Sequence, residues 1–281
     1  MKGEGYSPWV ASLLILPALV GLVLVFFVPL GEMFARSVAD PANYVKAVTS
    51  APNIRSFVYT LWLVAVIALL TVVVAYHWAW LMSRASGWRL GALLFLVLVP
   101  FWSNLLVRVF SWTILLRDQG PVNNFLAMVL GGLRFELMGN SLGTIIGATQ
   151  ICLPFAVFPI YTSMKRIDRN LLLASNSMAA SGFFFFRKVY LPLTVPGVVA
   201  ATVFTVVLSV GFFITPSLLG DPFQLMVSQV ILVQTTEMLD YGQASAMSVL
   251  LLLVTFVFLG VAGLFFPVFR ELGLEEDKRV R

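Results

Sequence analysis

The sequence predicts an all-α membrane protein with about six transmembrane helices, and three observations lead to this class. The chain has 281 residues, of which 60% are hydrophobic and 11% are charged, whereas soluble domains usually carry about 25% charge. Six apolar runs each reach the roughly 20 residues that a helix needs to cross the hydrocarbon. These runs are continuous, which differs from the alternation of a membrane barrel, and a helix satisfies its backbone groups internally.

The six runs predict one span each. They lie near residues 9–36, 57–84, 89–116, 142–165, 194–219 and 242–269. The first run is longer than the roughly 7–15 apolar residues of a cleaved signal peptide, so we expect it to remain as a span. The moderately apolar segment 122–137 is interrupted by glycines, and we expect a short helix there at the outer interface.

The distribution of lysine and arginine predicts the orientation. With the N-terminus placed in the cytoplasm, most basic residues fall on the inner side of the membrane, as the positive-inside rule requires. The predicted inner set is Lys2, Arg84, Arg89, Lys165, Arg166, Arg169, Arg187, Lys188, Arg270, Lys278, Arg279 and Arg281. Six crossings then place both termini in the cytoplasm. Because the basic residues flank apolar runs, the net charge of +5 does not indicate a nucleic-acid partner.

The composition argues against several kinds of active site. The chain has one cysteine and one histidine, and the middle of the predicted spans contains no Asp or Glu. An intramembrane enzyme needs a nucleophile with a base, or a metal cluster, so we expect no catalytic residue and no metal site. The sequence contains no G-x-x-x-x-G-K-[ST] pattern, so the chain is not expected to bind ATP itself.

Polar and aromatic residues inside the spans are the candidates for a solute pathway, because polar groups in the membrane usually face a cavity or a neighbouring helix. The candidates are Trp102, Asn104, Arg108, Trp112, Gln150, Thr205, Ser209 and Gln243. The spacing of Asn104, Arg108 and Trp112 predicts a shared helix face. Alternatives stay open, since hydroxyls bond back to their own helix and long or aromatic side chains anchor at the interface.

The segment 165–196 is the longest predicted cytoplasmic loop. A helix-prone stretch, a break at Ser181-Gly182 and a basic apolar piece predict two short helices joined by a turn. Such an element could dock into a groove of a partner protein, or it could rest on the lipid surface.

This segment resembles the cytoplasmic coupling loop of ABC importer permeases, in which Glu-Ala-Ala, a glycine and a later Leu-Pro follow at set spacings. Aligned on Leu191-Pro192, the chain has Leu173 in place of the acid and Ala179 in place of the glycine. The resemblance implies a coupling loop at 165–192 that contacts an ATPase. Its expected contact residues are Asp168, Leu172, Leu173, Ala174, Ser175, Ala179, Ala180, Ser181 and Pro192.

Further stretches, beginning at Pro100, Leu153, Gly211 and Tyr241, resemble the spermidine/putrescine group of these permeases. The resemblance implies the fold of a type I ABC importer permease, formed by residues 1–281 as a single domain in the bacterial inner membrane. It also implies alternating access driven by ATP and Mg on a partner. The expected partners are a second homologous permease, two ATPase subunits and a periplasmic binding protein.

The sequence leaves alternatives open for both the cargo and the driving force of transport. A polyamine is a cation and favours acids or aromatic faces along its route, whereas Arg108 would suit a zwitterionic or anionic cargo, such as an amino-acid derivative or an opine. An ion-coupled secondary transporter is a further alternative, and it predicts intramembrane carboxylates or broken helices in inverted halves. Neither pattern is clear in the sequence.

Overall fold

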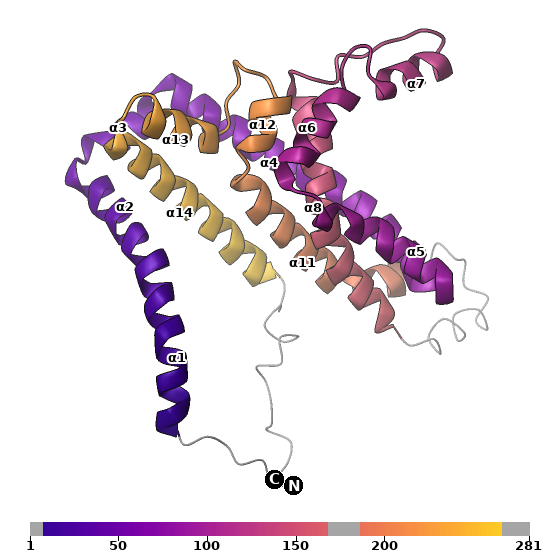
Figure 1. Cartoon of the computed structure of the whole chain (residues 1–281), viewed down its shortest axis with the longest axis horizontal. Coiled ribbons are helices and arrows are strands. Elements are labelled where there is room, and N and C mark those ends of the chain that lie inside the picture. The colour runs from indigo at the N-terminus through magenta and orange to yellow at the C-terminus, as the bar shows by residue number, and fades with distance from the viewer. Residues whose placement is uncertain (1–7, 168–185, 266–281) are drawn as a thin grey trace. The chain divides into compact units, whose positions relative to one another are not determined.

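The computed structural model describes residues 8–167 and 186–265, and every regular element in these ranges is a helix (Figure 1). The first half contains α1 (Pro8–Leu22), the π-helical turn η1 (Val23–Phe27), α2 (Val28–Ala39), α3 (Ala42–Thr49), α4 (Ala51–Arg84), α5 (Gly87–Leu98), the 3-10 turn η2 (Val99–Trp102), α6 (Leu105–Leu115) and α7 (Pro121–Val129). The second half contains α8 (Ser141–Lys165), the π-helical turn η3 (Phe186–Tyr190), α11 (Leu191–Val210), α12 (Ile214–Leu219), α13 (Val227–Thr236) and α14 (Tyr241–Phe265).

The predicted set of about six transmembrane helices is confirmed. Five helices in the described ranges are long and apolar enough to cross a membrane, at Ser12–Ala39, Ala51–Arg84, Ser141–Lys165, Phe186–Val210 and Tyr241–Gly263. The sixth is a bent pair, Gly87–Trp102 and Leu105–Leu115, with an angle of 104° between its halves. The segment expected near 122–137 does contain a short helix, α7.

Two of the apolar runs differ from the continuous helices that hydropathy predicts. The run 89–116 is broken after Trp102, where Pro100 lies in a 3-10 turn and Ser103 is extended. The run 194–219 ends its long helix at Val210 and continues as the separate helix α12. Thr215 therefore lies on α12 and not on the fifth span. Hydropathy did not detect either break because the residues at both breaks are mostly apolar.

The chain divides into two compact units, and the first comprises residues 1–54 and 230–253. Within it, the Tyr44 hydroxyl donates to Ser37 Oγ at 2.9 Å, and that Oγ donates to the Phe34 carbonyl at 2.7 Å. The Arg36 guanidinium lies 5.5 Å from the ring centroid of Tyr241. The side chains of α1 and η1 are exposed and apolar, as a lipid-facing span requires.

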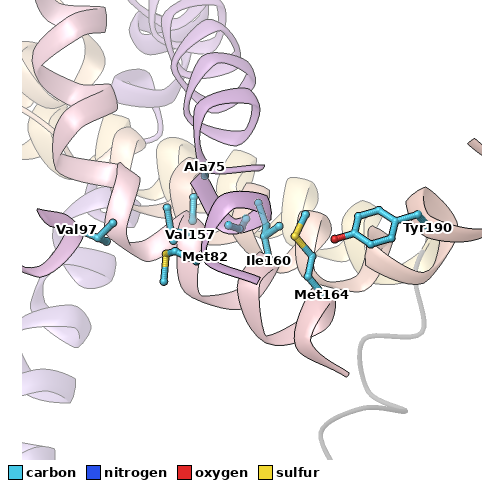
Figure 2. Close-up of a cluster of buried hydrophobic side chains, with 10 residues drawn as sticks. Ala75, Met82, Val97, Val157, Ile160, Met164 and Tyr190 are labelled. Atoms are coloured by element: carbon cyan, nitrogen blue, oxygen red, sulfur yellow. The ribbon is translucent and has the colours of Figure 1, made fainter. Parts of the chain in front are cut away.

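The second unit comprises residues 55–229 and 254–281, and the pair α8 and α11 forms its centre. One core cluster joins α4, α5, α8 and η3 through side chains that include Met82, Val97, Ile160 and Met164, and Figure 2 shows Tyr190 directed toward Met164. A second cluster packs α4 on α8 and α11 through Leu63, Ile67 and Val206. The unit is therefore packed around α8, whose candidate span is the most buried of the five unbroken ones.

Two glycines permit the closest approaches in this packing. A Cβ at Gly197 of α11 would lie 2.5 Å from the Pro159 carbonyl oxygen and 2.5 Å from Ser163 Oγ on α8. A Cβ at Gly143 of α8 would lie 2.7 Å from the carbonyl oxygens of Leu137 and Leu219. Small residues at helix contacts are typical of membrane proteins, where association depends on close packing.

Gln229 fixes the chain between α12 and α13. Its side chain is buried, its Oε1 accepts from the Met226 backbone N–H at 2.9 Å, and its Nε2 donates to Ser217 Oγ at 3.1 Å. The next N–H, of Val227, donates to Thr60 Oγ1 on α4 at 2.9 Å. These bonds satisfy the first N–H groups of α13, which would otherwise be buried without partners.

We expect Gln229→Leu to lower the free energy of unfolding by about 1–3 kcal/mol, since it leaves the Met226 N–H buried and unbonded. Thermal unfolding of the purified chain in detergent measures this effect. Gln224→Leu is the matched control, because Gln224 is exposed and bonds only to Asp221. Equal melting temperatures for the two variants would contradict the role given to Gln229.

Candidate solute pathway and coupling elements

The break in the third span is the most distinctive backbone feature near the predicted pathway residues. After η2, Ser103 is extended and Asn104 acts as the N-cap of α6, with its side-chain oxygen accepting from the Leu106 N–H at 2.8 Å. Asparagine is a preferred N-cap because its short side chain satisfies an otherwise unpaired N–H group. The structure thus assigns Asn104 to the helix start, where its carbonyl accepts from the Arg108 N–H at 3.1 Å, and the prediction that it shares a helix face with Arg108 and Trp112 stays a prediction.

Arg108 bridges the two halves of the broken span. Its guanidinium donates to the carbonyl oxygens of Pro100 and Ser103, the latter at 3.1 Å. The Pro100 carbonyl also accepts from the Ser103 N–H at 3.3 Å and from Ser103 Oγ at 2.9 Å. The arginine thus adds hydrogen bonds to backbone carbonyls at the break, where irregular backbone in a membrane needs polar partners. Its Nε is buried and has no partner in the described part of the chain.

Aromatic rings surround the same break. Trp102 is 77% exposed, and the ring of Phe101 lies 5.2 Å from that of Phe155 on α8. Sequence reasoning identified Trp102 and missed the two phenylalanines, because phenylalanine is common throughout this chain and gives no local signal. The break thus carries an exposed indole at Trp102, next in sequence to a phenylalanine whose ring contacts α8.

Trp112 and Gln150, two of the predicted pathway residues, lie on different helices and contact each other. The Trp112 Nε1–H donates to Gln150 Oε1 at 3.5 Å, which joins α6 to α8. Both residues are partly buried. A glutamine that is paired in this way costs less in the membrane than a free amide, so the contact accounts for Gln150 within the packing of α6 on α8.

Thr205 and Ser209 lie in the contact between α11 and α8. Thr205 Oγ1 donates to the Ala201 carbonyl of its own helix at 2.8 Å, and Ser209 Oγ lies 3.6 Å from Cys152 Sγ. All three side chains are fully buried. The alternative that hydroxyls bond back to their own helix is the one that the geometry of Thr205 favours, and Cys152 is a core residue.

Gln243 lies in the first turn of α14, in the first unit, whereas the other candidates belong to the second unit. Its backbone N–H donates to Asp240 Oδ1 at 2.9 Å. Its side chain is buried, and neither atom of the amide has a hydrogen-bond partner within residues 8–167 and 186–265. The predicted pathway role of Gln243 therefore stays a prediction.

The predicted coupling loop falls mostly outside the described residues. Asp168, Leu172, Leu173, Ala174, Ser175, Ala179, Ala180 and Ser181 lie in the range 168–185, so their predicted roles stay predictions. Pro192 is described, and it occupies the first turn of α11, where a missing N–H costs nothing. Met164 and Tyr190, which flank the undescribed range, belong to one core cluster. The loop therefore leaves and rejoins the second unit at the same end.

Comparison with known proteins shows which family has this arrangement. The spermidine/putrescine transport system permease protein PotB of Salmonella typhimurium is 33% identical over 248 residues, which cover 83% of this chain and 85% of that protein. The chain belongs to this family of permeases. The Escherichia coli PotB protein is 31% identical over 83% of the chain and 89% of its own length. No protein-family model matches the chain.

Solved structures agree with the fold of this permease family. The structure of a bacterial alginate ABC transporter in complex with a periplasmic protein carrying an alginate pentasaccharide contains a chain that superposes with a TM-score of 0.74 at 18% identity, covering 91% of this chain and 93% of that one. At this identity the likeness concerns the fold. The protein is thus a multi-pass inner-membrane permease subunit of an ABC importer, and it is not an enzyme.

Proposed function

We propose that this permease subunit imports a polyamine of the spermidine or putrescine type by alternating access. The observation that carries the proposal is the 33% identity to a spermidine/putrescine permease over 83% of the chain. The related proteins form one subunit of a transport system, so the proposed cargo route is shared between this chain and others.

The geometry around the broken span supports a cationic cargo. The sequence alone suggested that Arg108 would bind an anionic cargo. In the structure, its guanidinium donates to two backbone carbonyls. Its Nη2 group is therefore held by backbone partners within the chain. Trp102 remains exposed, and aromatic faces attract ammonium groups by about 0.5–2 kcal/mol each. A flexible diamine or triamine offers such groups together with apolar methylene spacers.

The proposed assembly has four kinds of component. The chain pairs with a second homologous permease, two ATPase subunits bind ATP and Mg on the cytoplasmic side, and a periplasmic protein delivers the cargo. Both termini are cytoplasmic in this arrangement, as the basic residues favour. Residues 165–192 form the proposed coupling loop, with Leu173 and Ala179 in place of the acid and the glycine of the family pattern.

Uptake of labelled spermidine tests the proposal, with the chain produced together with its partner subunits in cells that lack other polyamine importers. We expect ATP-dependent uptake that excess putrescine competes and that an acidic solute does not. We expect Trp102→Ala to lower uptake about fivefold or more through loss of a cation–π contact.

Trp102→Phe, which keeps an aromatic face, should retain most of the uptake. Trp9→Ala is the matched control, because Trp9 is also exposed, at 85%, but lies on α1. Uptake of acidic solutes alone would refute the polyamine cargo, and undiminished uptake by Trp102→Ala would remove Trp102 from the pathway.

A further inference from the structure

One end of the second unit gathers six basic side chains from four helical elements. They are Arg84 on α4, Arg89 on α5, Lys165 and Arg166 at the end of α8, and Arg187 and Lys188 on η3. All six are exposed. The elements meet at this end because Met82, Leu90, Met164 and Tyr190, each close in sequence to one or more of these cations, belong to the same core cluster. Figure 1 shows α5, α8 and α11 reaching this end together.

The described part of the second unit places no carboxylate at this end. Its acids are Asp118, Glu136 and Asp221, which lie in the connections at the opposite ends of α6, α8 and α12. The ion pair found among the described residues, Arg36 with Glu32, belongs to the first unit. The six cations therefore lack an acidic partner within the described ranges, and their mutual repulsion favours a bound anion.

The basic surface also carries apolar side chains. Trp88, next to Arg89, is 79% exposed, while Phe186 and Leu191, on either side of the η3 cations, are 38% and 37% exposed. Arg84 lies over the ring of Trp80 at 4.2 Å. An anion that matches this surface has both a phosphate group and hydrocarbon. Long basic side chains reach toward head groups from such positions, and tryptophan sits at the same depth.

We propose that this basic end binds the head group of an anionic phospholipid, with Arg84 and Arg89 flanking its phosphate from either side of the short α4–α5 connection. Basic surfaces between transmembrane helices are known to recognise anionic head groups, and each cation near the surface strengthens binding about fivefold. The lipid would thereby neutralise charge where four helical elements end. This inference goes beyond the proposed transport function and does not depend on the identity of the cargo.

Native mass spectrometry of the full-length chain, purified in neutral detergent with the subunits that remain bound, tests the proposal. The probe is a mixture of phosphatidylglycerol and phosphatidylcholine with matched acyl chains. We expect enrichment of phosphatidylglycerol on the wild-type protein and a loss of about fivefold or more in Arg84→Gln/Arg89→Gln. The control Arg55→Gln/Arg117→Gln removes the same charge from exposed positions elsewhere in the second unit and should retain the enrichment.

Equal enrichment in wild type and Arg84→Gln/Arg89→Gln would overturn the proposal, and so would an equal loss in both double variants. Displacement of the lipid by millimolar inorganic phosphate would also overturn it, because the site would then recognise a free anion. A difference seen only after the ATPase subunits are stripped away would assign the surface to a protein partner. If the double variant fails to fold, Arg89→Gln alone serves, since Arg89 makes no ring contact of the kind that Arg84 makes with Trp80.

Discussion

Replacing Gly197 with alanine is expected to destabilise the protein by about 2 kcal/mol and to reduce uptake in proportion to the folded protein that is lost. A Cβ at this position would lie 2.5 Å from the Pro159 carbonyl oxygen and 2.8 Å from Ser163 Cβ. The first atom belongs to the backbone of α8, so rotation of a side chain cannot relieve the clash. Overpacking of a tight core costs about 1–3 kcal/mol, and α8 and α11 form the centre of the second unit.

Thermal unfolding in detergent measures the effect of Gly197→Ala, and Gly260→Ala is the matched control. Gly260 also lies inside a long helix, but a Cβ there would have no atom within 4 Å. Alanine is favoured over glycine in a helix by about 1 kcal/mol, so the control should be neutral or stabilising. A Gly197→Ala protein as stable as wild type would show that α8 and α11 do not approach as closely as the structure has them.

The sequence was sufficient for the number of spans because crossing a membrane depends on a property of a whole segment. The roughly 20 apolar residues of a span can be counted, and each of the six predicted runs overlaps a candidate span, five of them unbroken and one bent. The bend of the third run depends on a few residues. Pro100, Ser103 and Asn104 are ordinary signals of a helix boundary, but they lie within an apolar run, and an average over that run conceals them.

The residue types of the candidate site could be predicted from the sequence, but the side chain that each residue contacts could not. Trp112 and Gln150 were both candidates, and only the packing of α6 against α8 shows that they bond to each other. Arg108 looked like a group for an anion because the sequence does not reveal that its guanidinium donates to two nearby backbone carbonyls. Phe155 gave no signal at all, since its role depends on the contact that its ring on α8 makes with the ring of Phe101.

Arg108→Leu is expected to lower both stability and uptake, because the guanidinium holds the bend of the third span in place. Hydrogen bonds to charged groups are worth about 1.5–3 kcal/mol each, and partial exposure of Arg108 reduces this, so we expect a loss of about 2 kcal/mol. Arg108→Lys should be intermediate, since an ammonium can donate to both carbonyls as the single nitrogen Nη2 does, but the lysine side chain is shorter and reaches them less well. Arg55→Leu, at an exposed position of α4, removes the same charge as a control.

Measuring the melting temperature together with the KM and maximal rate of uptake separates the two roles that Arg108 could have. A residue that holds the bend lowers the melting temperature and the maximal rate, while the KM of the remaining active protein stays near its wild-type value. A residue that contacts cargo changes KM and leaves the melting temperature unchanged. The second pattern would return Arg108 to the solute pathway, and it would also weaken the proposal of a cationic cargo, because a free guanidinium repels an ammonium group.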